Sequence, residues 1–86
     1  MTKAILTEAS LSWAGLGSAN LTEADLSGAN LSNASLTGTT LSEANLSSAD
    51  LSQSDLTYAI LYKADLTKAN LSKANLTTKR DGGIIF

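Results

Sequence analysis

Leucine recurs at every fifth position of this chain, from Leu6 to Leu76, without interruption. On an α-helix a step of five residues rotates the side chain by about 140°, so the leucines would be spread around the whole surface. On a straight β-strand an odd step sends successive leucines to opposite faces. Only a chain that turns once in every five residues directs all of them at one axis. The pattern therefore predicts a solenoid, in which each short side pairs with the side one coil away through backbone hydrogen bonds.

The positions around each leucine agree with this interpretation. Residues 4–78 divide into fifteen units of five with Leu in the centre, and the residue two before Leu is Ala in all but two units, which carry Thr39 and Ser54. A small residue is expected there because it also faces the interior. Asn or Asp precedes Leu in nine units, and Ser or Thr follows it in thirteen. Such short hydrogen-bonding side chains suit tight turns.

The unit A(D/N)LXX, repeated over residues 4–78, resembles the pentapeptide repeat family. The resemblance implies an all-β fold, a right-handed quadrilateral β-helix with four pentapeptides per coil, so that fifteen units form about 3.75 coils. We interpret residues 1–86 as one solenoid domain, with the repeats at 4–78 and a C-terminal cap or tail at 79–86. Residues twenty apart are then expected to stack in columns.

Charge and hydropathy narrow the expected partners. The chain has 86 residues, with 6 basic and 8 acidic side chains and a net charge of −2, a balance that favours neither nucleic acid nor an anionic membrane as a partner. The longest apolar run, at residues 59–62, is far shorter than the roughly 20 residues that span a bilayer. Polar residues interrupt the first turns of the chain, which does not fit a secretory signal. The expected location is therefore the cytoplasm.

The residue types most used in catalysis are missing from the sequence. Without histidine or cysteine, the chain has no Ser-His triad, no thiol nucleophile, no disulfide and none of the usual zinc sites. We therefore expect a protein that is not an enzyme and that uses no metal or other cofactor. Asp25 and Asp65 fall in one column, but on a convex wall we interpret them as turn residues.

Departures from the repeat mark the candidate interaction residues. Trp13 takes an outward position in the first coil, whose first three units lack Asn or Asp before Leu. One interpretation is an irregular, self-capping end coil. The other is an anchor for a partner, since tryptophan is enriched at protein interfaces. The tail places Ile84, Ile85 and Phe86 after two glycines, and we interpret them as a cap or a homodimer interface, with a loose tail as the alternative.

A second departure lies in the unit at 59–63 and the residue before it. Ile60 and Tyr62 replace small polar residues of the repeat, and Tyr58 precedes them. These three residues form a candidate exposed apolar patch on the wall. Ordinary surface residues and a protein-binding spot are both compatible with this composition.

The sequence supports two hypotheses of function. The first is a non-enzymatic structural or protein-interaction scaffold whose partner is an unidentified protein or a second copy bound through the solenoid ends. The alternative comes from the resemblance, because quinolone-resistance members of the family are DNA-mimicking inhibitors of DNA gyrase. A mimic needs a continuous negative stripe, whereas the acidic residues here are scattered. Many members of the family are bacterial, and cyanobacteria are rich in them, which makes such a source the expected one.

Overall fold

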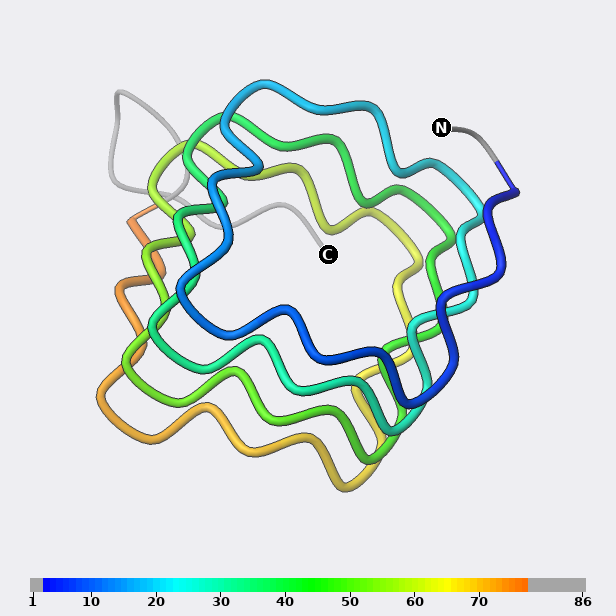
Figure 1. The fold of residues 1–86 in the computed structure, drawn as a ribbon. Helices are drawn as coiled ribbons and strands as arrows, with labels where there is room; N and C mark the ends of the chain where they lie inside the picture. The colour runs from blue at the N-terminus through cyan, green and yellow to red at the C-terminus, as the bar shows by residue number, and fades with distance from the viewer. Residues whose placement is uncertain (1–2, 78–86) are drawn as a thin grey trace.

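The chain winds into a four-sided solenoid in the computed structural model, which describes residues 3–77 (Figure 1). Eleven parallel β-bridges join residues twenty apart, from Ile5 with Asp25 to Asp55 with Asn75. One residue in five forms a bridge and two of the others form a turn, so within the described range each strand is a single residue long and there is no helix. Four five-residue sides therefore make one coil, as predicted.

Backbone hydrogen bonds connect each coil to both of its neighbours. In the unit at 24–28, the N–H of the second residue donates to the preceding coil at 2.8 Å, and the N–H groups of the third and fifth residues donate to the following coil at 2.7 and 2.9 Å. From Ala9 on, the first residue of each unit donates its N–H to the Leu carbonyl three residues earlier, at 2.9 to 3.1 Å. Three bonds of each interior unit therefore hold the stack together, and the fourth closes its corner.

Every corner that the structure describes is a type II turn. The residue at the last position of the repeat has a positive φ, between 56° and 69°, from Lys3 to Lys73. From Glu8 to Lys73 it lies in the third position of the turn that the preceding Leu carbonyl closes. Only Gly28 and Gly38 are glycines among these residues; the other thirteen carry side chains. None is β-branched, which fits the high cost of this backbone region for branched side chains.

The core is a stack of leucines lined by small residues. The leucines from Leu21 to Leu61 are fully buried, and the alanines beside them are buried as well. Thr39 and Ser54 replace Ala at two inward positions, and their hydroxyls donate to backbone carbonyls at 2.7 Å. The leucines nearest the two ends of the described range are only half-buried: Leu6, Leu11, Leu16, Leu66, Leu71 and Leu76. Burial of the core therefore depends on a neighbouring coil on each side.

Truncation of a leucine tests this dependence. Leu46→Ala should lower the free energy of unfolding by about 2 to 5 kcal/mol, because it leaves a cavity at a site that is fully buried. Leu6 is in the same column but is only half-buried. Leu6→Ala should therefore lower the free energy of unfolding by less than half as much as Leu46→Ala. Urea unfolding followed by circular dichroism measures both values. If the two variants lost equal unfolding free energy, burial of a leucine would not depend on a neighbouring coil on each side.

The turn geometry makes a separate prediction at Gln53, which is exposed and has a φ of 58°. Gln53→Val should lower the unfolding free energy by about 1 kcal/mol or more, since a β-branched residue is strained in this region. Gln53→Asn should leave it unchanged, because Asn tolerates positive φ. Thermal unfolding of the two variants beside the parent compares backbone strain at constant exposure. Equal unfolding temperatures of the Val and Asn variants would show that backbone strain at this position does not affect stability.

Candidate interaction surface

Asparagine and aspartate side chains on the wall complete the hydrogen bonding of the corners. In the nine units that carry Asn or Asp before Leu, the Oδ1 atom accepts a hydrogen bond from the N–H two residues later, at 2.9 to 3.2 Å. This N–H is the one donor of the unit that neither the turn nor the neighbouring coils use. The residues predicted to serve the turns therefore do so.

Three of these aspartates are stabilised in their ionised form. Hydrogen bonds from the side-chain hydroxyl and then from the N–H of Ser52 lower the pKa of Asp50. The hydroxyl and N–H of Thr57 lower the pKa of Asp55 in the same way, and those of Thr67 lower the pKa of Asp65. A carboxyl held as an ionised acceptor is poorly suited to act as a general acid. No cluster of three or more potential metal-binding side chains occurs within residues 3–77.

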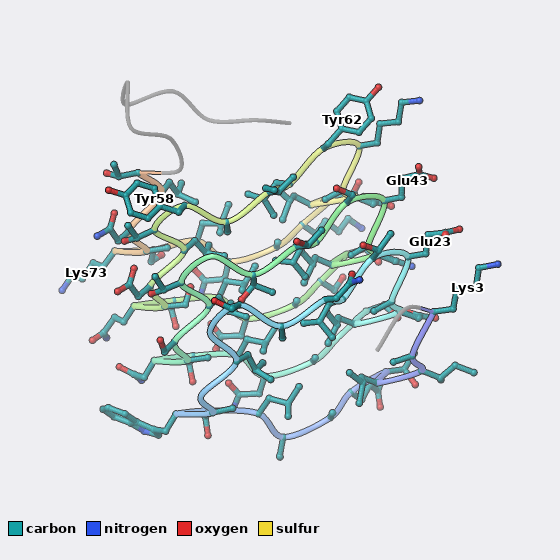
Figure 2. All side chains as sticks on the ribbon, turned by 90° about the horizontal axis from the view of Figure 1, so that it is seen from above. Lys3, Glu23, Glu43, Tyr58, Tyr62 and Lys73 are labelled. Atoms are coloured by element: carbon teal, nitrogen blue, oxygen red, sulfur yellow. The ribbon has the colours of Figure 1, made fainter. Side chains whose placement is uncertain are left out.

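The candidate patch lies along one side of the third coil. Tyr58 is at the corner where the side at 59–63 begins, and Tyr62 is near the corner where it ends (Figure 2). Their side chains are 51% and 47% exposed, whereas Ile60 between them is half-buried. The Nζ atom of Lys63 lies 5.2 Å from the centre of the Tyr62 ring, within the range of a cation–π contact. We call residues 58–63 the aromatic side.

The remaining predicted residues do not join the aromatic side. Trp13 is 77% exposed at a corner of the first coil. Tyr58 is at the next corner around the solenoid from Trp13, and it lies two coils further along the solenoid axis. The other three predicted residues, Ile84, Ile85 and Phe86, lie outside the described residues.

Ile5 was not among the predicted interaction residues, yet it is 81% exposed, more than any other large apolar side chain of residues 3–77. It occupies the wall position that Asn or Asp takes in most units. The replacement of Asn or Asp by isoleucine was the feature of the sequence that could have predicted this exposed apolar residue. The position faces outward, so an isoleucine there cannot pack into the core. Ile5 and Trp13 both belong to the first coil.

With this geometry established, comparison with known proteins identifies the family. The sequence profile of the family described as Pentapeptide repeats matches residues 19–57 and 44–78, in eight copies. The chain belongs to the pentapeptide repeat family. It therefore has the right-handed quadrilateral β-helix that its resemblance to this family implied.

Solved structures of family members support the same fold. A pentapeptide repeat protein from the thylakoid lumen of Arabidopsis thaliana is 33% identical, with a TM-score of 0.83, over 85% of this chain and 50% of that one. One from Nostoc is 36% identical, with a TM-score of 0.59, over 84% of this chain and 64% of that one. Rfr23 from the cyanobacterium Cyanothece is 32% identical, with a TM-score of 0.52, over 87% and 54%.

These relatives limit what can be transferred to this pentapeptide repeat chain. It spans between 50% and 64% of the length of the three proteins, and their names state no binding partner. None of the curated proteins compared with the chain matches it. Within residues 3–77 no helix has the length and apolar character needed to cross a membrane.

The bonded aspartates give the fold a predictable response to acid. Their folded-state pKa values lie below the ordinary value, so the stability they contribute is present at neutral pH. It should be lost as the pH falls below about 4, when the unfolded chain binds protons more readily. Urea midpoints at pH 7 and pH 3 measure the loss.

A matched variant separates these carboxylates from other acid effects. Asp50→Asn, Asp55→Asn and Asp65→Asn together retain an Oδ1 acceptor, as in the units that carry Asn naturally. The triple variant should fold normally at pH 7 and lose less stability than the parent between pH 7 and pH 3. An unchanged pH dependence would show that the bonded carboxylates are not responsible.

Proposed function

We propose that this pentapeptide repeat protein is a non-enzymatic scaffold that binds another protein through the aromatic side. The observation that carries the proposal is the position of two half-exposed tyrosines at the two ends of one short side of a hydrogen-bonded wall. Tyrosine combines a large apolar surface with a polar hydroxyl, which is why it is enriched where binding energy is concentrated at interfaces.

The rigidity of the wall supports this role. Both neighbouring coils bond to the aromatic side: Leu41 donates to the carbonyl of Ile60 at 2.7 Å, and Tyr58 donates its N–H to Thr77 at 2.7 Å. The Nζ atom of Lys63 also contacts the face of the Tyr62 ring. A partner would therefore meet a backbone that is already ordered before binding, which lowers the entropic cost of association.

Two features of the aromatic side are costly for the fold alone. Ile60 provides no oxygen to accept the N–H of Tyr62, a bond that the nine units with Asn or Asp all have. Tyr62 replaces the Ser or Thr of thirteen other units. Departures that give up a local hydrogen bond without improving the core are expected where function demands them.

The charge distribution favours this function over DNA mimicry. Lys3, Glu23 and Glu43 follow one another along one corner column (Figure 2). Lys63 continues this column, so its negative centre has a cation on each side. Lys68 and Lys73 occupy the next two corners of the last described coil. A DNA mimic needs about one negative charge per 1.7 Å of duplex length, which this wall does not provide. A cytoplasmic location stays a prediction.

Restoring the consensus of the repeat tests the proposal with little risk to folding. Ile60→Asn together with Tyr62→Ser recreates the hydrogen-bonded corner of the other units, and Tyr58→Asn suits the positive φ at that corner. The unmodified chain and the triple variant are immobilised at equal density and exposed to lysate of the native host. The unmodified chain should retain a partner protein from the lysate, and the triple variant should not. Identification by mass spectrometry should then allow Kd to be measured with purified partner, with a loss of about tenfold or more.

Controls define what would refute the scaffold. Gln53→Ser, an exposed corner on another side, should bind as the parent does. Equal retention by the parent and the triple variant would reject the aromatic side as the binding surface. A gyrase supercoiling assay at micromolar protein should show no inhibition, and clear inhibition would favour the DNA-mimic alternative instead.

A further inference from the structure

The side that stacks beneath the aromatic side carries small residues and one anion. Backbone hydrogen bonds join the two sides: Leu41 donates its N–H to the carbonyl of Ile60, and Glu43 donates its N–H to the carbonyl of Tyr62, both at 2.7 Å. The two sides are therefore one coil spacing apart, about 4.8 Å along the solenoid axis. We call residues 38–43 the low side. Its outward residues are Gly38, Thr40, Ser42 and Glu43.

The low side and the aromatic side differ in size and charge at every outward position. Residues twenty apart share a column, so each outward residue of the aromatic side has a counterpart on the low side. The counterpart is smaller at three positions, and at the last corner the cation Lys63 has the anion Glu43 as its counterpart. Figure 2 shows Glu43 and Tyr62 near one edge of this wall and Tyr58 near the other. The wall is therefore complementary to an inverted copy of itself.

We propose that the protein bound by the aromatic side is a second copy of this chain, with the aromatic side of each copy packed on the low side of the other. This inference rests on the proposed function and names its partner. The two-fold axis lies in the plane of the contact, is perpendicular to the solenoid axis and passes between the two sides. Both copies use the same surface, so association stops at the dimer.

In this arrangement each column faces the same column of the second copy, in the opposite direction along the solenoid. The facing pairs are Tyr58 with Gly38, Ile60 with Thr40, Tyr62 with Ser42, and Lys63 with Glu43. The two-fold axis forms each pair twice. Large residues that meet small ones allow close packing, and opposite charges across the contact fix its register. The missing side chain at Gly38 leaves room for the ring at the opposite corner.

Other arrangements of the same wall are less favourable. A two-fold axis through the low side would place Glu43 opposite Glu43, and one through the aromatic side would place Lys63 opposite Lys63. Like charges directly opposite each other are destabilising. An axis parallel to the solenoid would set the two aromatic sides against each other and leave a gap between the two low sides. The proposed register avoids both problems.

The exposed tyrosines set the expected strength of the dimer. Tyr58 and Tyr62 are about half exposed, so each offers roughly 100 Å² for burial, or about 400 Å² over both copies. The smaller and charged residues that face them bring the total to less than about 1,000 Å². Contacts of this size are transient. A reversible dimer with a Kd of about 0.1 mM is therefore expected.

Sedimentation equilibrium of the purified chain tests the dimer with two variants of equal net charge. Gly38→Glu should raise the Kd by about tenfold or more, because it fills the space that Tyr58 needs and sets an unpaired carboxylate against the ring. The fold accommodates this residue, since Glu occupies three other corners of positive φ. The nearest atom to an added Cβ, outside the adjacent residues, is the Ser18 Oγ at 3.5 Å. Gln53→Glu, at an exposed corner of another side, should leave the Kd unchanged.

Exchange of the facing charges tests the register. Glu43→Lys or Lys63→Glu alone should weaken the dimer by about tenfold, because each brings like charges together. The double variant reverses both pairs at an unchanged net charge and should dimerise like the parent. It should not form mixed dimers with the parent, because Lys would then face Lys and Glu would face Glu. Sedimentation of a fluorescently labelled parent with an excess of unlabelled double variant measures the mixed dimer.

Three results would reject the second copy as the partner. These are a purified chain that stays monomeric at about 1 mM, equal weakening by Gly38→Glu and Gln53→Glu, and mixed dimers between the double variant and the parent. A monomeric chain whose aromatic side still captures a different protein would reject this inference and leave the proposed function standing. A monomeric chain with equal retention by the parent and the aromatic-side variant would reject both.

Discussion

The parallel hydrogen bonding between residues twenty apart is the constraint on which the rest of this structure depends. Each side contributes only one bridged residue, and an isolated bridge has little stability. The stack is stable because every interior unit bonds to the coil before it and to the coil after it. The same rule closes the core, since a leucine is fully covered only when a coil lies on both sides. Cohesion and burial are therefore strongest in the middle coils and weakest at the ends.

The regularity of the repeat made the fold readable from the sequence, and it also limited what else could be read. A period of five is incompatible with a helix or a flat strand, so the turning chain and its leucine core followed from geometry. The number of sides per coil came from the family resemblance. The turn type was not predicted because positive φ is usually signalled by Gly or Asn, whereas Lys, Glu, Trp and Tyr occupy most of these corners. Their shared feature, the lack of branching at Cβ, is a weaker signal.

The interaction residues were predictable only in part, for a related reason. Exposure of Trp13, Tyr58 and Tyr62 followed from their outward positions in the unit. Their separation depends on which corner each occupies: Trp13 is on another column and another coil, and the two tyrosines are at opposite ends of one side. Ile60 was expected in the patch but is half-buried between its neighbours.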